Sequence, residues 1–309
     1  MQHEITLRLI DEIARAGSIR GAAEKMALTP SALNRRLLAV EEELDVPLFE
    51  RLASGVRLNA AGELFIAHVR RQLADTRRLR SQIEDLKGVR RGHIHVAFDD
   101  SLEQTAAFAR AMADYQSAHP GVTFGVDVVP PERLAADLNS YRADLGYALR
   151  GPVDTTIVSV ASAPARVVAV MAPDHPIGAA GIVRLESLVG QPIVLPPQGS
   201  LRTLLDIAMH IRKIPLNAVT EARSDFVHAR IRHGDVIGFE AEIEGARRPR
   251  DDGLLRLPLS EKDMPATSVH LLQLRGRSVP VAAGQFAETI KIDLAAAVDA
   301  ARASSDAET

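Results

Sequence analysis

The sequence predicts an α/β protein that is preceded by a small helical region rich in basic residues. Residues 1–92 contain 16 Lys and Arg against 13 Asp and Glu, whereas the remaining residues contain 21 against 27. From residue 93 onward, segments typical of strands and helices alternate, which predicts mostly parallel sheets covered by helices. At 309 residues the chain is too long for one ordinary core, so we expect more than one domain.

The composition excludes several classes of site. The sequence contains no cysteine, which rules out disulfides, thiolate metal sites and a cysteine nucleophile. No apolar run approaches the roughly 18 residues that a membrane helix needs, and the N-terminal segment has acidic residues inside its apolar pattern, unlike a signal peptide. We therefore expect a cytoplasmic protein with no membrane association.

Two short helices are predicted before residue 26. In the first, the apolar residues Ile5, Leu9 and Ile13 recur every four residues, and Gly17 is a suitable helix stop. Ser18 is a suitable N-cap for the second helix. Only a few residues separate this second helix from the next one, which predicts a helix-turn-helix.

A third helix is predicted to begin with Thr29 as its N-cap and Pro30 in its first turn. Its apolar residues recur at spacings of 4, 3 and 4 and should form a buried stripe: Leu33, Leu37, Val40 and Leu44. Another face carries Ser31, Asn34 and Arg35, where a helix that needs only solubility would more often carry Glu and Lys.

A β-hairpin with a turn at residues 54–55 is predicted next, with Arg51 and Arg57 on its two arms. Together with the preceding helices it forms a winged helix-turn-helix. Asn59 is a suitable cap for a long helix over residues 63–87. The apolar residues of that helix form a narrow seam: Ile66, Val69, Leu73, Leu79, Ile83 and Leu86. The seam favours a partner helix in a dimer, and packing against its own domain is the alternative.

The face of the third helix is predicted to enter the major groove of DNA. Arginine pairs well with guanine, and asparagine with adenine; arginines beside the reading face would contact phosphates. A two-fold dimer would then read inverted half-sites about 10 base pairs apart. The alternative is that these residues are solvated surface groups and caps. The candidate DNA-contacting residues are Ser18, Thr29, Pro30, Ser31, Asn34, Arg35, Arg36, Arg51 and Arg57.

The predicted domains are a DNA-binding domain over 1–58, a linker or dimerisation helix over 59–88, and a regulatory domain over 89–309. In the last, subdomain I comprises about 93–161 and 266–303, and subdomain II about 162–265. Open α/β sheets bind small molecules beyond the carboxyl ends of their strands and at helix N-termini. The candidate effector-binding residues are Asp100, Ser101, Pro130, Tyr147, Ser200, Leu201, Phe226 and Glu240. Ser101 and Ser200 are equally well explained as N-caps.

Three segments resemble the LysR-type transcriptional regulators: "GSIRGAAEKMALTPSALNRRLLAVEEELDVPLFERLASGVRLNAAGE", "MAPDHPI" and "RSVPVAAGQFAETI". The first is similar to the helix-turn-helix signature of that family almost residue for residue. It departs at Asn34, where serine is usual, at Pro30, where glutamine is usual, and at Asn59, where threonine is usual. The preference of the family for particular DNA bases is therefore the property that can least be carried over to this chain.

The resemblance implies two Rossmann-like regulatory subdomains of the periplasmic-binding-protein type, with an effector bound between them. It implies double-stranded promoter DNA, a small-molecule effector and RNA polymerase as partners, and assembly as a homodimer or homotetramer. It implies no catalytic residue, no metal and no cofactor.

Two other classes of protein are considered. A cytoplasmic enzyme or small-molecule-binding protein could use the same α/β region, but no H-E-x-x-H, G-x-S-x-G or P-loop motif is present. A secreted two-domain solute receptor would leave the basic N-terminal region unexplained. Within the regulator hypothesis, Asp99 and Asp100 would repel an anion at a nearby helix N-terminus, which favours a neutral or cationic effector, or an anion held wholly by subdomain II.

Overall fold

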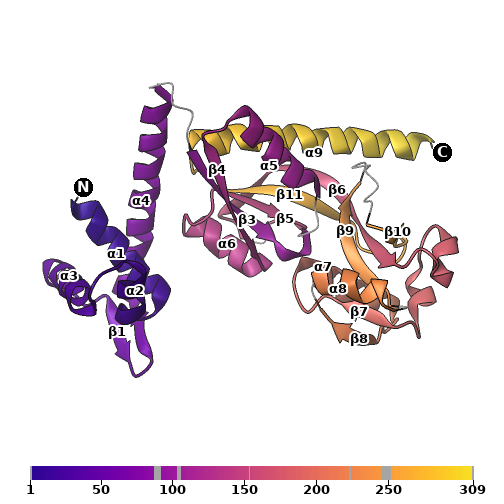
Figure 1. The fold of residues 1–309 in the computed structure, drawn as a ribbon, viewed down its shortest axis with the longest axis horizontal. Helices are drawn as coiled ribbons and strands as arrows, with labels where there is room; N and C mark the ends of the chain where they lie inside the picture. Colours follow the sequence, from indigo (N-terminus) through magenta and orange to yellow (C-terminus); the bar gives the residue numbers. More distant parts are fainter. Residues whose placement is uncertain are drawn as a thin grey trace. The chain divides into compact units, whose positions relative to one another are not determined.

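The computed structural model describes residues 2–86, 92–102, 106–152, 154–222, 224–234, 236–244 and 252–307. The chain divides into two compact units, Met1–Ile83 and Glu84–Thr309, which are described separately (Figure 1). Within the described residues, every helix is too short or too polar to span a lipid bilayer.

The first unit begins with the three predicted helices. They are α1 (Gln2–Ala16), α2 (Ile19–Lys25) and α3 (Pro30–Glu43). The side chains of Ser18 and Thr29 accept hydrogen bonds from backbone N–H groups in the first turns of α2 and α3. These caps satisfy donors that have no partner inside the helix, and the prediction that both residues cap helices is confirmed.

The helices enclose a small core, but one position of the apolar stripe predicted on α3 is wrong. Leu44 is 42% exposed, because it is the C-cap of α3 and lies beyond the last turn that packs on the core. Ile5, in the first turns of α1, is also exposed. The core consists of Leu9, Ile10, Ile13, Ala22, Ala23, Leu33, Leu37, Leu48, Phe49 and Ile66.

The predicted hairpin is present as β1 (Phe49–Leu52) and β2 (Gly55–Leu58), which pair antiparallel. Its turn lies at residues 53–54, one position earlier than predicted. The backbone N–H of Val56 donates to the carbonyl of Gly17 at 2.8 Å, so the hairpin is fixed against the turn between α1 and α2.

Helix α4 (Ala60–Leu86) follows the hairpin. Asn59 caps it as predicted, because its Oδ1 accepts from the N–H of Gly62 at 2.8 Å. The Asn59 amide also donates to the carbonyl of Pro47 at 2.8 Å. One side chain therefore fixes both the start of α4 and the loop that leads into the hairpin.

The apolar seam of α4 divides into two parts. Ile66, Val69 and Leu73 are buried within the first unit, where they pack in the same clusters as residues of α1. Further along the helix, Leu79 is 56% exposed and Ile83 is 42% exposed. The seam thus serves its own domain over its first half and leaves apolar side chains uncovered over its second half.

Replacing Gly62 with alanine should destabilise the first unit. A Cβ at this position would lie 2.0 Å from the carbonyl oxygen of Leu48, so the backbone must shift. Overpacking of this kind costs about 1–3 kcal/mol. Urea unfolding monitored in the first unit measures the loss. Gly284→Ala is the control, because its nearest contact would be an ordinary 3.6 Å, and equal unfolding midpoints for the two variants would contradict the prediction.

The second unit is built on a curled seven-stranded sheet with the order β10-β6-β11-β5-β3-β4, in which β9 also pairs with β6. A separate two-stranded sheet contains β7 and β8. The strands are β3 (Gly92–Asp99), β4 (Val122–Val129), β5 (Leu145–Ala148), β6 (Ile157–Met171), β7 (Ile193–Leu195), β8 (Ala218–Glu221), β9 (Gly238–Ile243), β10 (Leu255–Pro258) and β11 (Thr267–Leu274).

The α/β fold class is confirmed, but the expectation of mostly parallel sheets is wrong. The β3–β4, β3–β5 and β7–β8 pairs are parallel. All four pairs that involve β6 or β11 are antiparallel. The antiparallel pairs arise because the chain crosses between the two halves of the unit through β6 and returns through β11.

Strand β6 is shared by both halves of the unit. Its first part, Ile157–Ala165, pairs with β11, and its later part pairs with β9 and β10. The strand therefore runs through residues 161–162, where the sequence analysis divides subdomain I from subdomain II. A continuous strand joins the two subdomains.

Helices cover the sheets and frame the site described next (Figure 1). Side chains of α5 and α9 pack on one face of the β3–β4–β5 region, and those of α6 pack on the other. The helices of the second unit are α5 (Ala106–Ala118), α6 (Pro131–Asn139), α7 (Ser200–Arg212), α8 (Ser224–Arg232) and α9 (Val281–Ala307), with short 3-10 turns at Asp100–Leu102, Pro176–Ala180 and Leu185–Leu188.

Candidate functional site

The exposed face of α3 carries arginines that no carboxylate of the described residues neutralises. Arg35 and Arg36 are exposed and form no ion pair within the described residues. Elsewhere in the first unit arginines are commonly paired, as Arg70 is with Asp11 at 2.7 Å. Two guanidinium groups near the start of a capped helix, without internal partners, are available to an external anion.

Asn34 lies between this face and the core. It is half-buried, and its Oδ1 is buried and accepts no hydrogen bond from the described residues. Bidentate pairing with adenine needs both the amide oxygen and the amide nitrogen. The Asn34 amide must therefore rotate before it can pair with a base in this way.

The hairpin carries two arginines that differ in their ion pairing. Arg51 is exposed and has no ion pair within the described part of the chain. Arg57 donates to the Glu50 carboxylate at 2.7 Å, and this hydrogen bond raises the pKa of Arg57. Contact between Arg57 and a phosphate would have to compete with Glu50, whereas Arg51 has no such competitor among the described residues.

The position of the hairpin relative to α3 is set by Glu41. Its Oε1 accepts from the backbone N–H groups of Leu48, at 2.7 Å, and Phe49, at 3.3 Å. Glu41 lies in the last turn of α3, so its carboxylate connects the helix directly to the first hairpin strand. Arg51 is therefore carried on an element that is held against α3.

The remaining candidates in this unit lie at helix starts. The Ser18 hydroxyl accepts from a backbone N–H of α2 at 3.0 Å, and the Thr29 hydroxyl accepts from one of α3 at 3.3 Å. Pro30 and Ser31 are exposed, and the Ser31 hydroxyl lies 3.3 Å from that of Thr29. The hydroxyls of Ser18 and Thr29 are therefore capping groups, and that of Ser31 lies beside the Thr29 cap on the exposed surface.

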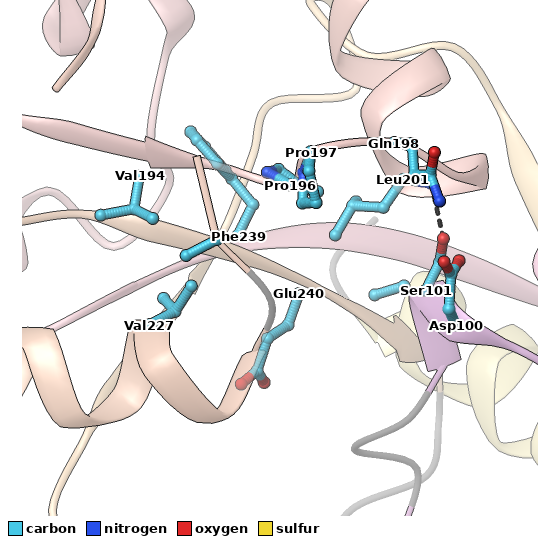
Figure 2. Close-up of a pocket in the computed structure, with 12 residues that line it drawn as sticks. Asp100, Ser101, Val194, Pro196, Pro197, Gln198, Leu201, Val227, Phe239 and Glu240 are labelled. Atoms are coloured by element: carbon cyan, nitrogen blue, oxygen red, sulfur yellow. Dashed lines mark hydrogen bonds between the residues drawn. The ribbon is translucent and has the colours of Figure 1, made fainter. Parts of the chain in front are cut away.

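A pocket of about 40 Å³ lies in the second unit, between the end of β3 and the elements around α7 (Figure 2). Most of its walls are apolar, and the polar groups are Asp100, Ser101, Gln198 and Glu240. The lining residues are Asp100, Ser101, Val194, Pro196, Pro197, Gln198, Leu201, Ala222, Val227, Phe239, Glu240 and Ala241. It thus joins residues that are about 100 positions apart in the sequence.

The buried carboxylate of Asp99 connects the two sides of this pocket. Asp99 is fully buried and accepts from the N–H of Ser101 at 2.9 Å and from the N–H of Leu149 at 3.1 Å. It also accepts from the hydroxyl of Ser200, at the start of α7, at 2.6 Å. The single carboxylate of Asp99 therefore satisfies all three donors and holds the start of α7 against the end of β3.

Ser101 and Asp100 form a second connection to α7. The Ser101 hydroxyl accepts from the N–H of Leu201 at 2.9 Å (Figure 2). Asp100 points toward the same helix start, and a Cβ at Gly199 would lie 2.5 Å from its Oδ1. Gly199 has a φ of +99°, so both its conformation and the neighbouring carboxylate favour glycine there.

Glu240 belongs to a buried ionic network at the other side of the pocket. Its carboxylate contacts His228 and pairs with Arg256 at 2.9 Å, and Figure 2 shows it turned away from Ser101 and Asp100. Arg256 also pairs with Asp252 at 2.6 Å, and this hydrogen bond lowers the pKa of Asp252 to about 2. The charge of Glu240 is thus compensated by the Arg256 guanidinium.

Family comparisons identify both units. Residues 6–63 match the model of the bacterial regulatory helix-turn-helix protein, lysR family, and residues 87–295 match the LysR substrate binding domain. The chain belongs to the LysR family. The resemblance inferred from the sequence is confirmed, and because the family consists of transcriptional regulators, it replaces the alternative of an enzyme.

Individual relatives agree with this membership. The RuBisCO operon transcriptional regulator of Allochromatium vinosum is 30% identical over 194 residues, covering 63% of this chain and 64% of the relative. An uncharacterised HTH-type regulator, YeiE of Escherichia coli K12, is 27% identical over 268 residues, covering 84% and 87%. The chain spans less than two thirds of the length of the first of these relatives.

Solved LysR-family structures share the fold. The full-length CbnR in complex with its target DNA superposes with a TM-score of 0.61 at 18% identity, covering 94% of this chain and 99% of that one. A full-length OxyR from Pseudomonas aeruginosa gives a TM-score of 0.65 at 17% identity, covering 95% and 99%. At these identities the likeness describes the fold alone.

The pocket between the end of β3 and α7 brings together four of the eight predicted effector-binding residues. Asp100, Ser101, Leu201 and Glu240 line it. Ser200 lies behind the lining, where its hydroxyl is bonded to Asp99. Ser101 accepts a hydrogen bond at a helix N-terminus, as the N-cap alternative predicted, but the helix is α7 and not the one that follows Ser101 in the sequence.

Three predicted effector-binding residues lie outside this pocket. Tyr147 is 2% exposed and packs against Phe108 with ring centroids 4.5 Å apart; burial raises the pKa of its hydroxyl. Pro130 precedes α6 as its N-cap. Phe226 is 55% exposed on α8. Tyr147 is corrected to a core residue, because its strand position places the ring among aromatic side chains of β3 and α5.

Sequence reasoning missed most of the apolar lining. Pro197 and Gln198 lie in the loop between β7 and α7, the segment to which the rule that ligands bind beyond strand ends points. Val227 and Phe239 gave no such signal, because buried apolar residues on a helix and a strand resemble ordinary core. Within the described residues, no group of three or more His, Asp or Glu side chains could hold a metal ion.

Proposed function

We propose that the chain is a sequence-specific DNA-binding transcriptional regulator whose promoter binding is modulated by a small molecule. In this proposal residues 1–58 bind DNA, residues 59–88 link and dimerise, and the regulatory domain from residue 89 onward binds the effector. The solved CbnR relative is in complex with its target DNA, which supports the same role for the similar helix-turn-helix in this chain.

The observation that carries the proposal is that Arg35 and Arg36 on α3 and Arg51 on the hairpin are exposed and form no ion pair with the described residues. Arg35 and Arg36 are exposed on a helix whose start is capped, and Arg51 is held beside it through Glu41. A helix of this size fits the major groove, where Arg35 reaches guanine, while Arg36 and Arg51 contact phosphates. Ser31 and Asn34 complete the face of α3 that contacts the bases. The residues at the helix starts beside this face are Ser18, Thr29 and Pro30. Arg57 contacts a phosphate once it is released from Glu50.

The uncovered half of α4 supports a homodimer. Leu79 and Ile83 are exposed apolar residues on one helix, and pairing two such helices would bury them. A two-fold dimer places two copies of α3 on inverted half-sites about 10 base pairs apart, or a multiple of that. Assembly as a homodimer or a homotetramer, contact with RNA polymerase and a cytoplasmic location complete the proposal.

The experiment that tests DNA binding uses DNA from the intergenic region upstream of the gene. Affinity for this DNA and for scrambled DNA of equal length is measured across a salt series. We expect tighter binding to the intergenic DNA and, for six or more phosphate contacts per dimer, a loss of about 10³-fold or more between 50 and 200 mM salt. Equal affinity for both DNAs at every salt concentration would contradict sequence-specific recognition.

A further inference from the structure

We propose that the effector of this pocket is a small, mostly apolar molecule that is uncharged or cationic, and that simple carboxylates are excluded. The inference rests on the proposed effector role of the pocket and specifies its chemistry.

The charged groups that line the pocket are negative. Asp100 and Glu240 both contribute to the wall, and among the described residues no lysine or arginine lines it. Because Glu240 is paired with Arg256, the like charge that a ligand meets comes mainly from Asp100. An entering carboxylate would lose its hydration and meet this charge, which is unfavourable in a partly closed site. A neutral or positively charged group avoids this cost.

Two of the donors at the start of α7 that could bind an anion are already used inside the protein. The start of α7 offers backbone N–H groups and the positive end of a helix dipole, but the N–H of Leu201 donates to Ser101. The hydroxyl of Ser200 donates to Asp99, and the Asp100 carboxylate lies against Gly199. The protein's own carboxylates and hydroxyl therefore occupy the place where an anionic effector would sit.

The arginines beside the pocket are neutralised as well. Arg202 donates to the carbonyl of the lining residue Pro196, and pairs with Asp206 at 2.9 Å and Glu221 at 2.7 Å. Arg256 pairs with Glu240 and Asp252. Each guanidinium faces two carboxylates, so neither supplies net positive charge to a ligand.

The remaining wall sets the size and polarity of the ligand. Val194, Leu201, Val227 and Phe239 are apolar and buried, and they favour a hydrocarbon group. The volume of about 40 Å³ equals the space of about three water molecules. Gln198 and Ser101 are the neutral polar groups that could orient an amide or an amine.

The test is a thermal-unfolding screen of the full chain. The panel contains carbon skeletons of three to eight heavy atoms, each as the carboxylate, the amide and the amine, at equal concentration and ionic strength. We expect amides or amines to raise the Tm by about 2–4 °C, and their carboxylates to leave it unchanged. Stabilisation by carboxylates alone, or by no member of the panel, would overturn the proposal.

Two variants locate the effect. In Asp100→Asn, stabilisation by amines should fall and carboxylates should begin to stabilise, while Asp174→Asn, which removes an exposed carboxylate elsewhere in the unit, should behave like wild type. Arg223 follows the lining residue Ala222 in the sequence and lies outside the described residues. Carboxylate binding that disappears in Arg223→Gln would identify an anion site and overturn the proposal.

Affinity for the intergenic DNA is measured in the same preparations without added ligand. Specific DNA binding that persists while only carboxylates stabilise the protein would refute the effector class and leave the regulator function intact. Loss of both specific DNA binding and ligand stabilisation would count against the proposed function itself.

Discussion

Replacing Asn34 and Arg35 together with alanine should lower affinity for the specific DNA site by about 10- to 100-fold, because a good bidentate base contact is worth about 1–3 kcal/mol. Arg35 is exposed and has no ion pair within the described residues, so its removal should cost the fold little. Binding is measured by fluorescence anisotropy at fixed salt with specific and scrambled DNA.

The control for this pair is Arg110→Ala, which removes an exposed arginine from α5 in the second unit. Its affinity for both DNAs should match that of wild type. A double variant that loses affinity equally for specific and scrambled DNA would show that these side chains contact phosphates and not bases. An unchanged affinity for both would remove α3 from the interface.

Replacing Asp99 with alanine should destabilise the second unit by about 3–5 kcal/mol. Asp99 is fully buried and accepts from two backbone N–H groups and the hydroxyl of Ser200. Each buried donor left without an acceptor costs about 1–3 kcal/mol, and the Ser200 hydroxyl can reorient to reduce its share. Urea unfolding of the second unit measures the difference.

The matched control is Asp174→Ala, which removes an exposed carboxylate and should change the free energy of unfolding by less than about 0.5 kcal/mol. Asp99→Asn keeps one acceptor oxygen and should retain part of the lost stability. If Asp99→Ala unfolds at the same urea concentration as Asp174→Ala, Asp99 does not hold α7 to the end of β3.

Local sequence patterns predicted the first unit well because its helix starts depend on interactions between residues that are close together in the sequence. The helix starts at Ser18, Thr29 and Asn59 depend on a side-chain oxygen and the next turn of the backbone, all of which are adjacent in sequence. The exposed Leu44 shows the limit, because apolar periodicity does not reveal where the packed surface ends.

The structure of the second unit depends on contacts between residues that are far apart in the sequence. The predictions from the sequence failed where such contacts determine the pairing of strands and the position of side chains. The first half of β6 is rich in Ser and Ala and does not look like a strand, yet it pairs with β11 more than 100 residues later. Its antiparallel pairing could not be read from an alternating α/β pattern. The Asp99–Ser200 and Ser101–Leu201 contacts likewise join segments about 100 residues apart.

The most direct test of the regulator function is a footprint of the full chain on its upstream intergenic DNA, with the Asn34→Ala, Arg35→Ala variant run beside wild type. We predict a protected, roughly palindromic segment with half-sites about 10 base pairs apart or a multiple of that, which weakens with salt and is lost in the variant. Protection of the same segment by wild type and variant alike would contradict the reading role of α3, and the absence of any protected segment at every salt concentration would contradict sequence-specific binding to this region.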